Sequence, residues 1–272
     1  MRELKAIIFD VDGTLAATEE THRQAFNEAF REFDIPFQWS VPEYIKLLSI
    51  SGGKERTYKF LKSQSYDVPG KENLRDYTQK LHQRKSEIYR EKLVAGHIGL
   101  RIGVERLIKE AKQNGIIMAI ATSTSTANVE VLLKNALGGT ALSYFDTLVS
   151  CDLVADKKPS PAVYQYALAN LGIKSENCIA VEDTCNGNLA ALAVGMKTII
   201  TTHPLTADED FTGALLVIDQ LGEPDDHFTV TSGDPHGADF VNIDLLEKII
   251  SSDCSSQFRS NLEQPSLAVA AN

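Results

Sequence analysis

The sequence has few cysteines and none of the spacings that hold a zinc ion. The four cysteines are Cys151, Cys178, Cys185 and Cys254, and no two of them form a CxxC pair. Such a pattern is typical of a protein in a reducing compartment without a zinc site. Basic residues are also in deficit, with 27 Lys and Arg against 37 Asp and Glu and a net charge of −10. This acidic balance argues against a nucleic-acid partner and against an anionic membrane surface.

Long apolar runs are missing as well. No stretch is long enough to span a bilayer, and residues 1–5 lead directly into a strand-like segment, so we expect neither a membrane span nor a signal peptide. Hydrophobic residues make up 43% of the 272-residue chain and charged residues 24%, which excludes a disordered or fibrous protein. We therefore expect a soluble, cytoplasmic monomer. A plastid location would apply if the source were a plant or alga and a transit peptide had been removed.

Short apolar runs recur along the chain, with segments of helical periodicity between them. The runs cover residues 6–9, 116–121, 147–149, 178–181 and 198–200, and such runs are typical of strands buried on both faces of a parallel sheet. Apolar spacing and glycine stops predict helices over 104–114, 161–171 and 186–194. Strands that alternate with helices predict an α/β fold. Residues 222–242, rich in Gly, Pro and Asp, predict a long surface loop.

Residues 18–95 break this alternation. An apolar stripe at helical spacing (Phe26, Ala29, Phe30, Phe33) is followed by further helical segments without a clear strand. We therefore predict a core of residues 1–17 and 96–250, an inserted helical cap over 18–95, and a flexible tail over 251–272. The cap segment carries 14 Lys and Arg against 12 Asp and Glu. A slightly basic cap over an acidic core would suit an anionic small molecule, although the acidic loops could equally serve only solubility.

Polar residues follow four of the predicted strands. They are Asp10 and Asp12 in DVDGT, Thr122 and Ser123, Lys157 and Lys158, and Glu182 and Asp183. Ligands of an open parallel sheet bind at this edge. Several carboxylates cannot lie together ionised without a cation, and oxygen ligands with room for water favour Mg²⁺. Such an ion would let a carboxylate approach a phosphate, while Lys158 and the donors at 122–123 hold the phosphoryl oxygens.

These four motifs, in this order, resemble those of the haloacid dehalogenase superfamily. The resemblance implies a Rossmann-like parallel sheet core with an inserted α-helical cap. It also implies that Asp10 is a nucleophile that forms an aspartyl-phosphate, that Asp12 is the general acid/base, and that Lys158, which precedes the proline, anchors the phosphoryl group. Mg²⁺ would be bound by Asp10, the backbone carbonyl of Asp12 and Asp183, with Glu182 beside it. For Lys157 we expect a solvated side chain, as is usual for lysine.

The cap lies between the first and second motifs, which resembles the β-phosphoglucomutase-like subfamily. Segments 18–26, 49–56, 82–85 and 122–128 resemble its CbbY group. This resemblance implies a phosphatase that converts xylulose-1,5-bisphosphate, an inhibitor of Rubisco, to xylulose 5-phosphate. The residues that would bind the substrate are Glu19, His22, Gly52, Gly53, Lys54, Glu55, Arg56, His82, Lys85, Thr122, Ser123, Thr124 and Asn128.

The roles of the cap residues can also be interpreted without the resemblance to the CbbY group. A bisphosphate carries a second dianion, for which Arg56 offers a planar fork while Lys54 and Lys85 offer point charges. Residues 52–53 would let backbone amides approach an anion. The alternatives to substrate binding are that Lys54 and Arg56 are solvated at the start of a helix, that residues 52–53 form an ordinary turn, and that His22 has a structural role.

Three classes of function remain open at this point. They are a phosphatase for this or another sugar phosphate, a phosphomutase on the same scaffold, and a non-catalytic sensor of a phosphorylated metabolite. The presence of both Asp10 and Asp12 argues against the sensor, and the continuation Thr14-Leu15 favours a hydrolase over a mutase. On the helix of Lys85, Arg84 and His82 are possible substitutes for that lysine.

Overall fold

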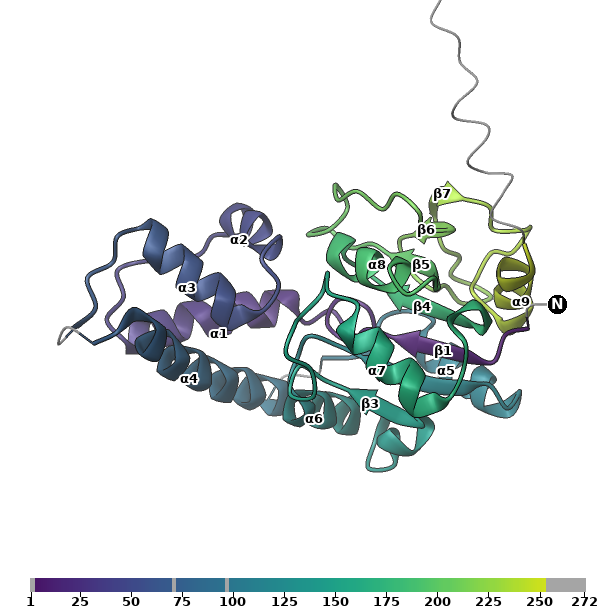
Figure 1. Cartoon of the computed structure of the whole chain (residues 1–272), viewed down its shortest axis with the longest axis horizontal. Helices are drawn as coiled ribbons and strands as arrows, with labels where there is room; N and C mark the ends of the chain where they lie inside the picture. The colour runs from purple at the N-terminus through teal and green to yellow at the C-terminus, as the bar shows by residue number, and fades with distance from the viewer. Residues whose placement is uncertain (1–2, 70–71, 96–97, 253–272) are drawn as a thin grey trace, which may run out of the picture.

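The computed structural model describes residues 3–69, 72–95 and 98–252 (Figure 1). Most of the predicted tail, from residue 253 onward, lies outside the described residues. Among these residues, no helix combines the length and the hydrophobicity that a bilayer crossing requires. The expected monomer, its location and the absence of nucleic-acid partners stay predictions.

A sheet forms the centre of the larger part of the molecule. Its strands are β1 (Ala6–Phe9), β2 (Ile117–Ala121), β3 (Thr147–Val149), β4 (Cys178–Glu182), β5 (Lys197–Thr201), β6 (Leu216–Ile218) and β7 (Val230–Gly233). Their order is β3-β2-β1-β4-β5-β6-β7. Strands β1 to β6 are parallel and β7 is antiparallel to β6. The predicted parallel α/β fold is confirmed, but the prediction of a loop throughout 222–242 is wrong because β7 lies within it.

Helices pack on both faces of the sheet. On one face, α7 (Ala162–Leu171) and α8 (Cys185–Leu192) bury Ala6 and Ile8. On the other face, α5 (Val104–Gln113) and α9 (Ile243–Ser251) belong to the hydrophobic core that contains Ile7 and Phe9. Successive strand residues point to opposite faces, and all four residues of β1 are fully buried. This explains why the predicted strands are apolar without interruption.

The remaining helices of this part are α6 (Thr126–Leu137) and two short 3-10 helices, Ala141–Tyr144 and Ser175–Asn177. Helices α5, α7 and α8 confirm the three predicted helices with small shifts at their ends. In α7 the expected N-cap Ser160 is replaced by Pro161 at that position. Proline at a helix start loses nothing, because the first backbone N–H groups have no partner within the helix.

Residues 18–95, which we call the helical segment, contain α1 (Glu19–Glu32), α2 (Val41–Leu48), α3 (Gly53–Ser63) and α4 (Leu74–Ala95). Its described residues include no strand. In Figure 1 these helices lie beside the sheet rather than on it, with α1 alongside α4. A buried aromatic cluster of Phe26, Phe30, Trp39 and Tyr44 packs between them. That this segment acts as a separate cap domain stays a prediction.

Candidate active site

The ends of β1, β2 and β4 meet at one edge of the sheet. Phe9, the last residue of β1, lies opposite Ile120 of β2 and Val181 of β4. The residues that follow Phe9 and Val181 are Asp10 and Glu182. Parallel register therefore brings together side chains that are more than 170 positions apart in sequence, as the strand-end pattern predicts.

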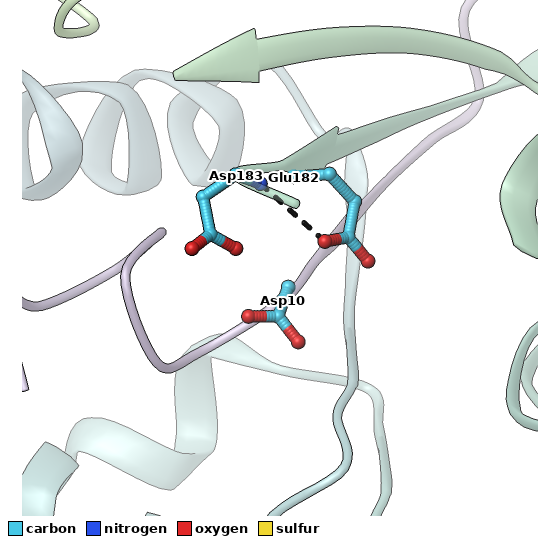
Figure 2. A group of neighbouring side chains, drawn as sticks. All are labelled: Asp10, Glu182 and Asp183. Atoms are coloured by element: carbon cyan, nitrogen blue, oxygen red, sulfur yellow. Dashed lines mark hydrogen bonds between the residues drawn. The ribbon is translucent and has the colours of Figure 1, made fainter. Parts of the chain in front are cut away.

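An acidic cluster, made of Asp10, Glu182 and Asp183, lies at this edge. One carboxylate oxygen from each residue lies within 4.8 Å of the others, and Figure 2 shows the three groups turned toward a common space. All three are buried. Burial and mutual repulsion raise the pKa of each carboxyl, that of Asp10 to about 8. Three hard oxygen donors with excess negative charge fit a divalent cation such as Mg²⁺.

Lys158 lies against this cluster. Its Nζ donates hydrogen bonds to Asp10 Oδ1 at 2.6 Å, Glu182 Oε1 at 2.5 Å and the carbonyl oxygen of Ala121 at 2.8 Å. Only 4% of Lys158 is exposed. Burial acts to lower its pKa, but the two carboxylates outweigh burial and raise it. Lys158 therefore stays charged and compensates part of the negative charge.

The neighbouring lysine behaves differently. Lys157 Nζ lies 3.0 Å from Glu55 Oε2, an ion pair that joins the β3–α7 loop to α3. The prediction that Lys157 is solvated is wrong in this respect, because its side chain is only 22% exposed. Of the two adjacent lysines, Lys158 thus contacts the acidic cluster and Lys157 contacts the helical segment.

The carboxylate of Glu182 accepts two further hydrogen bonds. The hydroxyl of Tyr164, on α7, donates to Glu182 Oε1 at 2.5 Å, and the backbone N–H of Asp183 donates to Oε2 at 3.4 Å. A Cβ atom on Gly187 would lie 1.9 Å from Glu182 Oε2. The first turn of α8 therefore needs glycine to make room for this carboxylate. Tyr164 was not predicted, since a tyrosine on an apolar helix face is typical of core packing.

Asp183 has two donors of its own. The Thr14 hydroxyl donates to Oδ1 at 3.2 Å, and His203 Nε2 lies 3.0 Å from Oδ2. Burial, together with the charge of Arg101, lowers the pKa of His203. His203 follows β5 and was not predicted as a site residue. The rule that strand ends carry the site could have found it.

The carboxylate of Asp12 makes its contacts with the helical segment rather than with the acidic cluster. Its Oδ1 accepts from Thr18 Oγ1 at 2.6 Å and Tyr89 OH at 3.3 Å, and lies 3.1 Å from His22 Nε2. Burial acts to raise the pKa of Asp12, but His22 and Thr18 outweigh it and lower the pKa. Because this carboxylate lies outside the cluster, a metal role for Asp12 rests on its backbone carbonyl. Thr18 and Tyr89 were not predicted.

His22 continues this chain of contacts. Its Nδ1 lies 2.6 Å from Lys85 Nζ, and its ring stacks on that of Tyr89 with centroids 3.8 Å apart. Lys85 is buried over the rings of Phe26 and Tyr89. Burial lowers the pKa of Lys85 to about 7. His22 therefore contacts both Asp12 and Lys85, and it lines the cavity described below. Tyr89, four residues after Lys85 on α4, could have been found from helical spacing.

A cavity of about 580 Å³ lies between the helical segment and the edge of the sheet. Every predicted substrate-binding residue lines it, as do Asp10, Asp12, Lys158 and Asp183; Glu182 does not. The members from the helical segment are Glu19, His22, Gly52, Gly53, Lys54, Glu55, Arg56, His82 and Lys85. Those from the sheet side that were predicted for substrate are Thr122, Ser123, Thr124 and Asn128. The cavity thus brings together residues from both regions.

Arg56 is held firmly at the wall of the cavity. It is 8% exposed, its Nε donates to the carbonyl oxygen of Leu47 at 3.0 Å, and its guanidinium lies 5.3 Å from the ring centroid of Tyr44. The Tyr44 hydroxyl donates to Glu19 Oε2 at 2.8 Å. The solvated alternative is therefore wrong for Arg56. Lys54 is exposed and lines the cavity, and it forms no ion pair with any residue that the structure describes.

The glycine pair at the start of α3 allows close approaches. Gly52 has φ +89°, and a Cβ there would lie 2.6 Å from Lys157 Nζ. A Cβ on Gly53 would lie 2.8 Å from His82 Nε2. Burial, and then the charge of Lys85, lower the pKa of His82 to about 3, so His82 is a neutral wall residue. The positive φ of Gly52 favours glycine there, and the close approach of His82 favours glycine at position 53.

Further polar contacts join the helical segment to the sheet side. Asn186 Nδ2 donates to Ser51 Oγ at 3.1 Å, and Arg90 donates to Asn128 Oδ1 at 3.4 Å. Asn128 is thus engaged with α4. With the ion pair of Lys157 described above, these contacts hold the two walls together around the cavity.

Comparison with known proteins agrees with this arrangement. Residues 4–195 match the haloacid dehalogenase-like hydrolases. The chain belongs to this family. The protein CbbY of Cereibacter sphaeroides is 42% identical over 220 residues, which is 81% of this chain and 94% of that protein. As a haloacid dehalogenase-like hydrolase with relatives of this kind, the chain is an enzyme and a phosphatase.

Solved structures of this hydrolase family share the fold. CbbY from Rhodobacter sphaeroides in complex with phosphate has a TM-score of 0.75 and 41% identity, and covers 80% of this chain and 94% of its own. A mutant of that protein in complex with xylulose-(1,5)bisphosphate gives the same values. The resemblance inferred from the four motifs is thereby confirmed.

Proposed function

We propose that this enzyme is a Mg²⁺-dependent sugar-phosphate phosphatase that acts through an aspartyl-phosphate on Asp10. The substrate that we propose is xylulose-1,5-bisphosphate, which would be converted to xylulose 5-phosphate and phosphate. The observation that carries this proposal is the position of Asp10. Its carboxylate lies in the acidic cluster, is bonded to Lys158, and lines a cavity whose other wall carries Arg56.

The acidic cluster supports the choice of cation. Asp10, Asp183 and the backbone carbonyl of Asp12 would hold Mg²⁺, with Glu182 beside them. When bound, the ion neutralises phosphate charge, so that an anionic nucleophile can approach phosphorus. Glu182 also keeps Lys158 in place, because both side chains of this ion pair are buried.

In the first step Asp10 attacks phosphorus. A bond forms between an Asp10 oxygen and phosphorus, and the bond from phosphorus to the sugar oxygen breaks. The leaving oxygen takes a proton from Asp12, which lies 3.1 Å from His22 Nε2. His22 and Thr18 keep Asp12 ionised in the free enzyme; in this proposal the bound phosphate, an anion beside it, raises its pKa so that Asp12 takes up a proton from solvent before the leaving oxygen departs. In the second step water attacks phosphorus, its proton goes to Asp12, and the bond to Asp10 breaks. Lys158 stays protonated throughout and donates to phosphoryl oxygens.

The wall of the cavity formed by the helical segment, which we call the helical wall, supports the choice of a bisphosphate. Arg56 is desolvated and fixed, and Lys85 lies on the same wall; a phosphate far from the cation needs such donors. Glu19 would accept a hydrogen bond from a sugar hydroxyl through the oxygen that Tyr44 leaves free. The CbbY mutant solved with xylulose-(1,5)bisphosphate adds weight to this substrate.

The test is a phosphate-release assay over sugar monophosphates and bisphosphates with Mg²⁺. We expect release that EDTA stops, with xylulose-1,5-bisphosphate preferred over ribulose-1,5-bisphosphate. Asp10→Asn should lower kcat by more than about 10⁴-fold, because the nucleophile is lost. Asp225→Asn, which changes an exposed carboxylate, is the matched control and should release phosphate like the wild type.

Two outcomes would contradict this proposal. Phosphate release that persists in Asp10→Asn would exclude the aspartyl-phosphate. Isomerised sugar without free phosphate, after incubation with β-glucose 1-phosphate and a bisphosphate primer, would instead show a phosphomutase.

A further inference from the structure

His203 lies next to the acidic cluster but has no part in the steps above. It follows β5, in the loop that leads to β6, and its side chain is 13% exposed. Its Nε2 lies 3.0 Å from Asp183 Oδ2. The acidic cluster is therefore contacted by a residue that follows β5, whereas its own members follow or end β1 and β4.

The ring of His203 has a fixed orientation. Its Nδ1 accepts a hydrogen bond from the backbone N–H of Leu205 at 3.3 Å. The backbone N–H of His203 donates to Thr206 Oγ1 at 3.3 Å, and the N–H of Thr206 donates back to the carbonyl of His203 at 2.9 Å. Because Nδ1 accepts a hydrogen bond, it carries no proton, and the ring proton is on Nε2. His203 therefore donates to Asp183.

Asp183 is thus held on both of its oxygens. Oδ1 accepts from the Thr14 hydroxyl at 3.2 Å, and Oδ2 accepts from His203. A Cβ on Gly13 would lie 2.0 Å from Asp183 Oδ2 and 2.9 Å from His203 Nε2, so glycine is what lets the DVDGT loop close over this pair. The geometry fixes the rotation of the Asp183 carboxylate before a cation arrives.

We propose that His203 is a positioning residue that sets the orientation of the Asp183 carboxylate for the bound cation. This inference rests on the proposed function, which places the cation at the acidic cluster. Donors that orient a ligating side chain contribute to metal affinity although they do not touch the ion, and their loss costs about 10- to 100-fold in affinity.

The test measures Mn²⁺ binding by electron paramagnetic resonance, without substrate. His203→Leu removes the donor, and we expect about 10- to 100-fold weaker binding. His203→Gln places an amide N–H near the position of Nε2, and we expect binding within about threefold of the wild type. His227→Leu, which changes an exposed histidine, is the control and should bind as the wild type does. Thermal melting without metal checks that each variant is folded.

Two results would overturn the inference. One is wild-type affinity in a folded His203→Leu. The other is an equal loss in His203→Gln and His203→Leu, which would show that the imidazole serves packing; the Gln variant alone decides this if the Leu variant does not fold. If the wild type binds Mn²⁺ but releases no phosphate, the proposed function is wrong, and the Mn²⁺ affinities of the His203 variants still test this inference. If the wild type binds no Mn²⁺, both the proposed function and this inference are wrong.

Discussion

The two walls of the cavity are built in different ways. On the sheet side, Asp10 and Asp183 follow directly from strands, and buried ion pairs with Lys158 hold the cluster. On the side of the helical segment, Arg56 is placed by helix packing and by the ring of Tyr44. The strand wall thus has its positions fixed by backbone register, whereas the helical wall depends on side chains that pack between helices.

This difference suggests a division of labour. Groups fixed by the sheet can be held within a fraction of an ångström, which the reacting atoms require. Groups on the helical segment are joined to the sheet side by a few polar contacts, such as Lys157 to Glu55 and Asn186 to Ser51. We expect changes in the strand wall to act on kcat and changes in the helical wall to act on KM.

The sharpest test of this division compares two adjacent lysines. Lys158→Met removes the cation beside Asp10, and kcat should fall by about 10²- to 10³-fold or more, as when a single charge-stabilising donor is lost. Lys157→Met is the matched control, because it changes the neighbouring residue without entering the acidic cluster. Its kcat should stay within about threefold of the wild type. Equal losses of kcat in the two variants, measured by steady-state phosphate release, would break the comparison.

The helical wall is tested next at Arg56. Arg56→Met removes a desolvated guanidinium, and the KM for xylulose-1,5-bisphosphate should rise by about 10- to 100-fold, since a hydrogen bond to a charged group contributes about 1.5–3 kcal/mol. The KM for a sugar monophosphate should change little. Arg84→Met is the control, because Arg84 is bonded to Glu32 outside the cavity.

A matching loss on monophosphates and bisphosphates would show that Arg56 supports the structure of the wall and does not bind a second phosphate. A large effect of Arg84→Met would favour that residue as the donor, the alternative that the sequence leaves open.

The strand wall could be predicted from the sequence because its pattern is local. Each apolar run ends in a polar group, and parallel register alone brings Asp10, Thr122 and Asp183 to one edge. The choice of Lys158 over Lys157 came from the family resemblance, in which the lysine precedes a proline, and Lys158 is the one that contacts Asp10. The strand-end rule would have reached His203, the second residue after β5, but a lone histidine there resembles an ordinary loop residue.

The contacts of the helical wall could not be predicted in the same way. Tyr44 looks like a core residue in sequence, and its hydroxyl gains a role only through Glu19, 25 positions away. Tyr164 on α7 is a similar case on the sheet side, with Glu182 as its partner. The missed strand β7 has a similar cause. Its residues are all exposed, so no alternation of apolar and polar residues marks it.

The weakest expected effect concerns the ion pair between the walls. Lys157 Nζ and Glu55 Oε2 lie 3.0 Å apart, with side chains 22% and 42% exposed. Pairs of this exposure contribute about 0.2–1 kcal/mol, so Glu55→Gln and Lys157→Gln should each raise KM by about two- to fivefold with kcat unchanged. In the double variant the two effects should not add. The charge-reversed pair Glu55→Lys with Lys157→Glu should recover part of the loss. If the effects of the two single substitutions on KM add fully in the double variant, the two walls are held together without this ion pair. Only the sheet side would then determine the geometry of the site.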